Sequence, residues 1–221
     1  HKFNMEVGDG DRKQLMSGTI DRVDICENDT DVYVRIIDYK TGKKDFNIVK
    51  TYYGIDIQLM VYMEAAMKLV AKMRPGKNVI PAGVFYYNIS DPIVSATTES
   101  AEEIEDKIKG ELRLKGMVNS DKDIDEKMDN TEGTSLNIPV SRKADGGFDS
   151  RRSKVMNTEQ FNMLGRFVDV RAVDTADRIA GGDIRRSPYK DGQFSSCDRC
   201  PYGAVCGFSV DLPGCNYRKL K

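Results

Sequence analysis

Three side chains in the N-terminal half, Asp21, Asp38 and Lys40, have types and spacing that suit the binding of a divalent cation. Asp38 and Lys40 are two residues apart, so on a strand their side chains would share a face. If a hairpin places Asp21 across from Asp38, two carboxylates and an ammonium converge beside the apolar pair Ile36 and Ile37. Two carboxylates at a buried strand end repel each other and are costly to desolvate, and a cation removes that cost.

Magnesium suits such a site because it takes oxygen ligands, keeps several waters and commonly binds one or two carboxylates plus phosphate oxygens. It would polarise a phosphate and lower the pKa of a bound water. Lys40 would orient that water or stabilise the charge that grows on the phosphate. The pattern favours phosphodiester hydrolysis, although the spacing alone also fits a structural ion pair between Lys40 and one aspartate on an ordinary hairpin.

Hydrophobic patterning predicts the elements that position these groups. Residues 16–26 alternate apolar and polar side chains, which predicts a strand, and residues 31–40 predict a second strand paired antiparallel to it. Helical spacing of apolar residues predicts a helix over 55–73, which Pro75 and Gly76 end. The hairpin followed by a long helix is typical of a mixed α/β domain.

The rest of the chain is less regular. The pattern predicts a strand over 79–90, a charged surface helix over 101–115 and a helix over 158–180 that begins at a cap, Asn157 or Thr158. Residues 119–150 are polar and are expected to form a long or partly disordered loop. The chain is expected to be irregular from residue 181 onward.

Three motifs together resemble the successive motifs of RecB-family PD-(D/E)XK nucleases: GTIDRVD at 18–24, IIDYKTG at 36–42 and YGIDIQLMVY at 53–62. The Asp-Arg-x-Asp form and the Tyr-Tyr-Gly run before the glutamine look most like the AddB branch of that family. The resemblance implies an α/β, restriction-endonuclease-like PD-(D/E)XK core over residues 1–190, with a mixed central sheet flanked by helices. An irregular cysteine-rich segment, residues 191–221, is expected to pack on the same domain.

The resemblance also implies roles for single residues. Asp21, Asp38 and the backbone carbonyl of Tyr39 would bind Mg²⁺ or Mn²⁺, and Lys40 would be the catalytic lysine. Gln58 and Tyr62, four residues apart on one helix face, would border the site; Tyr62 fits core packing equally well. Arg22 and Asp24 are expected to form a supporting ion pair.

The family often has a further histidine ligand before the first aspartate. The one histidine of this chain is His1, which we interpret as a terminal or tag remnant rather than that ligand. Because the chain does not begin with Met, we expect it to be a piece of a longer protein.

Cysteines gather near the C-terminal end, where Cys197, Cys200 and Cys206 are closely spaced without a histidine. Such spacing favours an iron–sulfur cluster over structural zinc, which usually takes two ligand pairs. It resembles the three C-terminal cysteines of the [4Fe–4S] site in the AddB family, whose fourth ligand lies far upstream. Cys26 is expected to be a buried apolar residue, and Cys215 lies outside the motif. We therefore expect the cluster in the full-length protein, and a damaged or absent cluster in this chain alone.

The resemblance implies a Mg²⁺-dependent DNA exonuclease domain that trims a single-stranded end fed by a helicase, with an AddA-type helicase–nuclease subunit as partner and break resection as the process. The alternatives are a free-standing, Cas4-like nuclease and a non-catalytic DNA-binding scaffold of the same fold. No Gly-x-x-x-x-Gly-Lys-Ser/Thr loop is present in the chain, so any ATP-driven motor lies elsewhere.

Bulk properties limit how DNA would be bound. Among 221 residues, 31% are charged, yet the net charge is −1, so phosphate binding would need a local basic groove or metal ions. Two basic stretches, within 142–154 and 185–190, fit either phosphate contacts or an ordinary solvated surface. No apolar run approaches the roughly 20 residues of a membrane span, and the odd number of cysteines argues against a disulfide framework. We expect a cytoplasmic protein.

Overall fold

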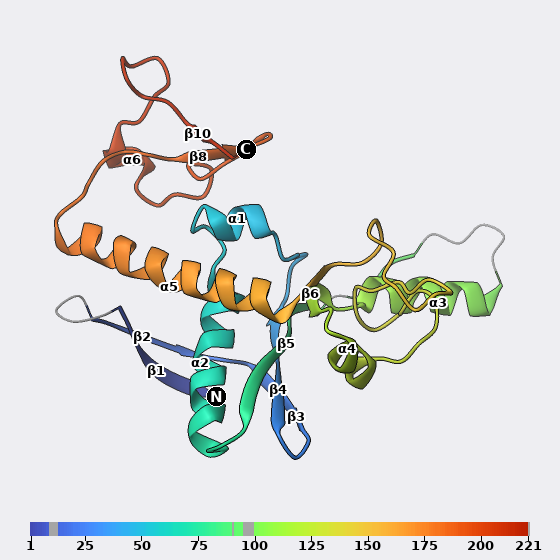
Figure 1. Cartoon of the computed structure of the whole chain (residues 1–221). Helices are drawn as coiled ribbons and strands as arrows, with labels where there is room; N and C mark the ends of the chain where they lie inside the picture. Colours follow the sequence, from blue (N-terminus) through green and yellow to red (C-terminus); the bar gives the residue numbers. More distant parts are fainter. Residues whose placement is uncertain (9–12, 90, 95–99, 221) are drawn as a thin grey trace.

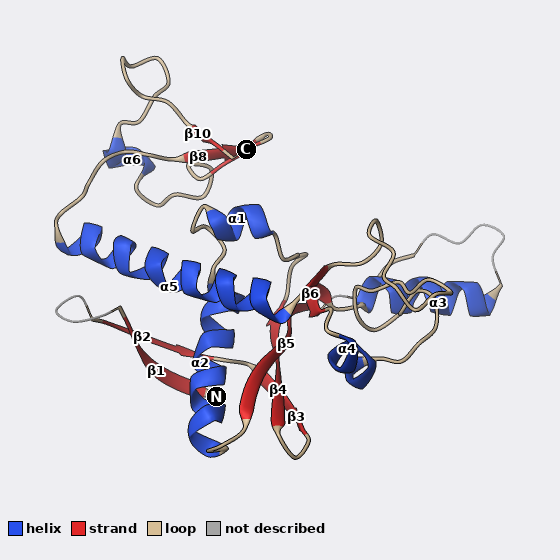
Figure 2. Ribbon diagram, viewed as in Figure 1, coloured by secondary structure: helices blue, strands red, loops and turns tan. Residues whose placement is uncertain are grey.

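A five-stranded mixed sheet forms the centre of the protein, whose computed structural model describes residues 1–8, 13–89, 91–94 and 100–220 (Figures 1 and 2). The strand order is β3-β4-β5-β6-β7, with antiparallel β3–β4 and β5–β6 pairs and parallel β4–β5 and β6–β7 pairs. The strands are β3 (Arg22–Glu27), β4 (Asp31–Lys40), β5 (Asn78–Asn88), β6 (Lys115–Asn119) and β7 (Val155–Met156). The predicted α/β class with a mixed sheet is confirmed.

The predicted hairpin is present, but its first strand is shorter than expected. Residues 16–26 do not form one strand, because the chain turns inward at Ile20, which is 2% exposed. Before that turn, β2 (Gln14–Thr19) pairs with β1 (Lys2–Val7) in a separate two-stranded sheet. After it, β3 pairs with β4 as predicted, with Arg22 opposite Ile37.

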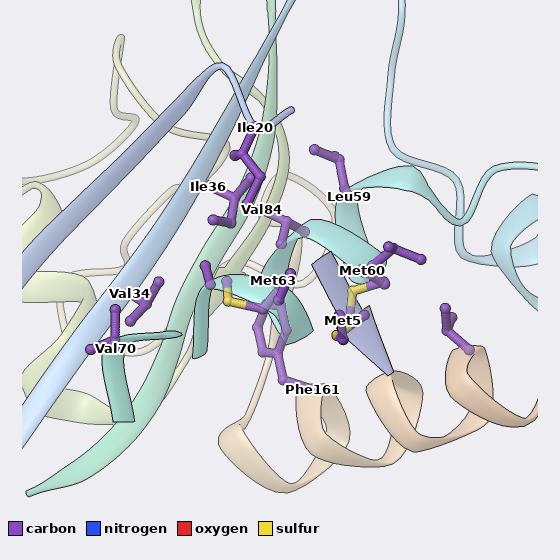
Figure 3. Packing of buried hydrophobic residues seen from close by; sticks show 14 of the residues in the cluster. Met5, Ile20, Val34, Ile36, Leu59, Met60, Met63, Val70, Val84 and Phe161 are labelled. Carbon is purple, nitrogen blue, oxygen red and sulfur yellow. The ribbon is translucent and has the colours of Figure 1, made fainter. Parts of the chain in front are cut away.

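Two helices and the β1–β2 ribbon cover one face of the central sheet (Figure 1). They are α2 (Gln58–Met73) and α5 (Thr158–Ala180), and the short α1 (Ile48–Tyr52) precedes α2. The core between these layers contains Ile36, Val84, Leu59, Met63 and Phe161 (Figure 3). β4, predicted from its β-branched and aromatic residues, is buried on both faces, and the helical spacing of apolar residues from which α2 was predicted faces this core.

The helix predicted over 55–73 begins three residues late, at Gln58, because residues 53–56 still form the turn after α1, in which Gly54 has a φ of 73° and the Ile55 N–H donates to the Lys50 carbonyl. The helix predicted over 158–180 is confirmed with the same bounds. Its cap is Asn157, which forms a reciprocal capping box with Gln160.

Residues 101–150 differ most from expectation: they add strand β6 to the sheet and pack Ile124, Ile138 and Val140 against its other face. The charged helix α3 (Ala101–Leu112) ends early because the chain enters β6 at Lys115. The segment expected as a polar, partly disordered loop contains α4 (Lys122–Met128) and then inserts Ile138 and Val140 against the sheet residue Phe85. A single carboxylate organises the loop: burial raises the pKa of Asp129, but hydrogen bonds, led by that from the Ser135 hydroxyl, lower it to about 2.

The C-terminal segment is more regular than predicted. It forms a small sheet of order β10-β8-β9 and one helical turn. The elements are β8 (Tyr189–Asp191), β9 (Phe194–Ser195), α6 (Gly203–Cys206) and β10 (Arg218–Lys219). An ion pair of 3.0 Å between Lys50 Nζ and Asp191 Oδ2 joins this segment to α1. Within the described ranges, no helix has the length and apolar character needed to cross a membrane.

The β5–β6 pairing requires a glycine at position 116. A Cβ there would lie 1.9 Å from the carbonyl oxygen of Val84 and 2.8 Å from the Cα of Phe85, so the two strands would have to separate. We expect Gly116→Ala to lower the free energy of unfolding by about 1–3 kcal/mol, as overpacking does elsewhere. Urea denaturation followed by circular dichroism measures this change.

The matched control is Gly110→Ala. Gly110 lies inside α3 with nothing within 4 Å of an added Cβ. The same substitution should there stabilise the protein by roughly 0.5–1 kcal/mol, since alanine favours the helix. Equal effects of the two changes would contradict the packing of β5 on β6.

Candidate active site

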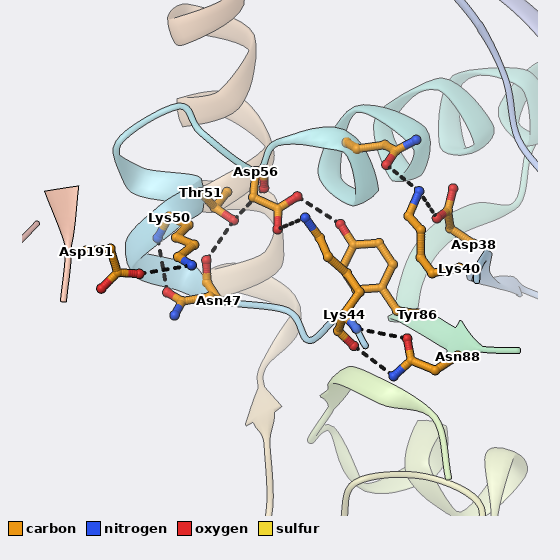
Figure 4. A network of polar contacts seen from close by, with 11 residues as sticks. Asp38, Lys40, Lys44, Asn47, Lys50, Thr51, Asp56, Tyr86, Asn88 and Asp191 are labelled. Atoms are coloured by element: carbon orange, nitrogen blue, oxygen red, sulfur yellow. Dashed lines mark hydrogen bonds and ion pairs between the residues drawn. The ribbon is translucent and has the colours of Figure 1, made fainter. Parts of the chain in front are cut away.

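A chain of polar contacts runs from the end of β4 to the start of α2. Asp38 is 2% exposed, and its Oδ2 lies 2.5 Å from Lys40 Nζ (Figure 4). The same Nζ donates a hydrogen bond of 3.0 Å to Gln58 Oε1, and Gln58 Nε2 donates one of 2.8 Å to the Tyr62 hydroxyl. The contacts place four of the five predicted catalytic side chains in one cluster, because the end of β4 lies beside the start of α2.

Asp21, the fifth, joins the cluster through the backbone. It is exposed, and its Oδ2 accepts a hydrogen bond of 2.9 Å from the Tyr39 N–H, between Asp38 and Lys40 in the sequence. Burial raises the pKa of the Asp38 carboxyl; Lys40 opposes this shift, and the negative charge of Asp21 adds to it. The two carboxylates therefore face the same small region, as the hairpin predicted.

The donor set fits a magnesium-type cation. Asp38 Oδ2 is buried against the Lys40 ammonium, yet burial still raises the pKa of this carboxyl, so the surrounding lysines do not fully offset the cost of burying its charge. Two carboxylates and a nearby backbone carbonyl are oxygen ligands, which Mg²⁺ and Mn²⁺ prefer, and Mg²⁺ completes its shell with water and phosphate. Across the described part of the chain, no group of three or more His, Cys, Asp or Glu side chains could hold a metal. A cation here would depend on those additional oxygens.

A second lysine lies beside the site, and the sequence did not single it out. Lys44 Nζ forms an ion pair of 2.9 Å with Oδ2 of Asp56, which is 8% exposed. The buried Tyr86 hydroxyl donates a hydrogen bond of 2.9 Å to the other Asp56 oxygen (Figure 4). Lys44 and Lys40 both lie over the Tyr86 ring, with Nζ 5.5 and 5.6 Å from its centroid.

The charge of Lys44 reaches Asp38, whose pKa it helps to lower against the effect of burial. Burial, and then the Asp56 carboxylate, raise the pKa of Tyr86 well above its usual range, so its hydroxyl remains a donor. The available signals were an acidic residue in the apolar run before Gln58 and a lysine four residues after Lys40, but spacing alone cannot pair them.

The supporting ion pair between Arg22 and Asp24 is confirmed, with Arg22 Nε 2.7 Å from Asp24 Oδ1. Arg35, on the neighbouring strand, binds the other oxygen of the same carboxylate. Burial raises the pKa of Asp24, but the two arginines lower it below its usual value. The pair fixes the β3–β4 hairpin close to Asp21.

His1 lies beside the segment that leads to Asp21. Its carbonyl accepts a hydrogen bond of 2.8 Å from the Ile20 N–H, and its side chain is exposed.

Some side chains of the two basic stretches contact other parts of the protein. Arg142 donates to the Thr131 carbonyl, and Lys154 pairs with Asp45. In the second stretch, Arg185 pairs with Asp183.

The expectation for Cys26 was wrong: it is exposed on the edge strand β3, because position 26 falls on the side of the hairpin that α2 does not cover. The other four thiols are free and at least partly accessible. The predicted cluster ligands lie in consecutive turns, with the Cys200 N–H donating to the Cys197 carbonyl and the Cys206 N–H to the Tyr202 carbonyl. Among the described residues, no three of these thiols are grouped closely enough to hold a metal ion.

Known proteins resemble this chain over nearly its whole length. It is 38% identical over 217 residues to a protein of Caldanaerobacter subterraneus subsp. tengcongensis that is named as one subunit of an ATP-dependent helicase/deoxyribonuclease; the match covers 97% of this chain and 18% of that relative. Proteins of the same description from Clostridium botulinum (strain Hall) and Lachnoclostridium phytofermentans are 38% and 37% identical, over 98% and 96% of this chain and 19% of each relative. The chain thus spans about a fifth of the length of these relatives.

A family profile described as the PD-(D/E)XK nuclease superfamily matches residues 2–207. The match includes β3, β4 and α2, which bring Asp21, Asp38, Lys40 and Gln58 together. With the mixed central sheet flanked by helices, the match shows that the chain belongs to the PD-(D/E)XK nuclease superfamily.

Proposed function

We propose that this chain is the Mg²⁺- or Mn²⁺-dependent deoxyribonuclease domain of a helicase–nuclease and hydrolyses single-stranded DNA. The observation that carries the proposal is the buried Asp38 carboxylate, which has Lys40 on one side and the charge of Asp21 on the other. The word "deoxyribonuclease" in the names of the similar proteins supports DNA as the substrate.

Each residue has a separate task in this proposal. Asp21, Asp38 and the Tyr39 carbonyl would hold the cation, which when bound supplies charge that polarises the phosphate and lowers the pKa of water. Lys40, fixed by Gln58, would donate to the scissile phosphate and stabilise its growing negative charge. Gln58 is itself oriented by Tyr62, so α2 positions the lysine without touching the reacting atoms.

We further propose that the domain works within a longer, AddB-type polypeptide that pairs with an AddA-type helicase–nuclease, which feeds it a single-stranded end during resection of DNA breaks. The similar proteins are named as subunits of an ATP-dependent helicase/deoxyribonuclease, which supports this assignment. Free thiols at all five cysteines fit a reducing cytoplasm.

A Cas4-like nuclease or a DNA-binding scaffold would share the fold. The assembled contact between Asp38 and Lys40 favours a catalytic domain over a scaffold.

Asp38→Asn tests the catalytic proposal directly. It removes the charged ligand while keeping the shape of the side chain, so cleavage of labelled single-stranded DNA with Mg²⁺ or Mn²⁺ should fall by at least about 100-fold, the upper cost of losing even an indirect metal contact. Asp29→Asn, in the exposed turn at the other end of the hairpin, should cleave like the wild type. Unchanged cleavage by Asp38→Asn, or none by the wild type, would favour the scaffold.

Metal binding can be measured without catalysis. Mg²⁺ or Mn²⁺ should raise the Tm of the wild type and leave that of Asp38→Asn nearly unchanged, since a ligand that binds only the folded state stabilises it. The increase should shrink as pH falls, because protons compete with the cation for a carboxyl whose pKa burial has raised. An equal increase in both proteins would place the cation elsewhere.

The raised pKa of Asp38 also predicts how the stability of the metal-free protein depends on pH. An acid whose pKa is higher in the folded than in the unfolded state destabilises the fold above its folded pKa, and the penalty disappears as pH falls through that pKa. Metal-free Asp38→Asn should therefore be more stable than the wild type at neutral pH, with a smaller difference in acid. Urea denaturation across the pH range would show this, and a difference that grows in acid would contradict it.

For the cysteine segment we propose a [4Fe–4S] cluster that Cys197, Cys200 and Cys206 share with an upstream cysteine of the full-length protein. Their spacing and thiolate chemistry support it. The chain alone, purified anaerobically, should hold well under one cluster per chain by iron analysis and visible absorbance. A stoichiometric cluster would show that the chain supplies all four ligands.

A further inference from the structure

A cavity of about 530 Å³ opens on the sheet face opposite Asp38. Ile37 and Leu114 line part of it, and six larger side chains surround it: Arg22, Arg35, Lys109, Arg113, Tyr39 and Tyr87. Its volume lies in the range of small-ligand sites, roughly 300–1,000 Å³. No carboxylate is among the described residues that line it, so its chemistry is aromatic and cationic.

Tyr39 joins the cavity to the candidate active site. It lies between Asp38 and Lys40, so strand alternation puts its ring on the other face of β4 while its N–H binds Asp21. Tyr87 is its register partner on β5, and the two rings meet edge to face, 5.9 Å apart at 89°. The Tyr39 side chain is 38% exposed, which leaves an aromatic surface one residue from the proposed metal ligands.

The positive charges of the cavity are not equally compensated. Arg22 and Arg35 share the Asp24 carboxylate, and Lys109 pairs with Glu105. Arg113 makes no ion pair within the described ranges; one of its terminal nitrogens donates to the Ser135 carbonyl, and its Nε is buried without a hydrogen bond. A partly buried guanidinium without an anion carries an uncompensated charge, and a phosphate supplies matching acceptors.

We propose that this cavity binds one nucleotide of the substrate strand next to the scissile phosphodiester, with its base on the Tyr39–Tyr87 pair and its phosphate on Arg113. A nucleotide combines an aromatic face with a phosphate, and both have matching partners in this cavity. The proposal rests on the proposed DNA substrate and adds a binding site to it.

Binding is tested apart from cleavage, in full chains that carry Asp38→Asn. Tyr87→Leu and Arg113→Gln are each added, and the Kd for a short fluorescent single-stranded oligonucleotide is measured by anisotropy. Each change should weaken binding by about tenfold, since a stacked base contributes roughly 1–3 kcal/mol. The matched control is Arg74→Gln, on an exposed arginine that pairs with Glu27 at the far end of α2; it should leave the Kd unchanged.

Abasic substitution tests the stacking without altering the protein. Each position of the oligonucleotide is made abasic in turn, and one position should weaken binding by a similar factor. That loss should disappear in Tyr87→Leu, because the partner of the base is already missing. Melting curves check that both cavity variants fold, and the abasic series on the parent protein does not depend on their folding.

The outcomes separate this proposal from the proposed function. Three results would overturn the nucleotide site. Both cavity variants could bind the oligonucleotide with the Kd of the parent protein, or Arg74→Gln could weaken binding as much as they do. The effect of the abasic position could also persist in Tyr87→Leu. If a free deoxynucleoside monophosphate bound as tightly as the oligonucleotide, a DNA strand would not be the occupant of this cavity. If the cavity effects hold but the wild type cleaves no DNA with metal, the nuclease proposal fails and the binding site stands.

Discussion

The burial of one carboxylate at the end of a central strand sets the constraint on which the site depends. Asp38 is almost inaccessible to water, and its ionised form is disfavoured there. Lys40 compensates part of that charge, but the effect of burial on the pKa of the carboxyl remains the larger one. Burying this carboxylate lowers the stability of the fold, and additional positive charge beside Asp38 offsets that loss.

The topology explains why the compensating groups meet there. β4 and β5 are parallel, so their ends lie at the same edge of the sheet, with Asp38 opposite Tyr86 in the register. The turn after β4 returns Lys44 to this edge, where Asn88 holds its backbone through two hydrogen bonds. α2 begins beside both strands, which gives Gln58 its contact with Lys40.

The sequence predicted what local periodicity and turn residues determine. The bounds of β4 and α5, the antiparallel hairpin and the convergence of Asp21 with Asp38 follow from patterns within about twenty residues. The break at Ile20, the strand β6 and the burial of Asp129, Ser135 and residues 138–141 depend on partners distant in the chain, and polar composition concealed them. Cys26 shows the same limit, since its exposure depends on which side of the hairpin other elements cover.

The two faces of β4 separate two kinds of chemistry. Asp38 and Lys40 face the α2 side, where buried charge favours a cation, whereas Tyr39 and Ile37 face a cavity rich in arginine. Between these two faces, the backbone N–H of Tyr39 donates a hydrogen bond to the Asp21 carboxylate. A DNA strand that contacted both faces would have a base stacked on Tyr39 and a phosphate held at the proposed metal site, and these two contacts lie on neighbouring residues of β4. Positioning of this kind is what phosphoryl transfer most requires of a protein.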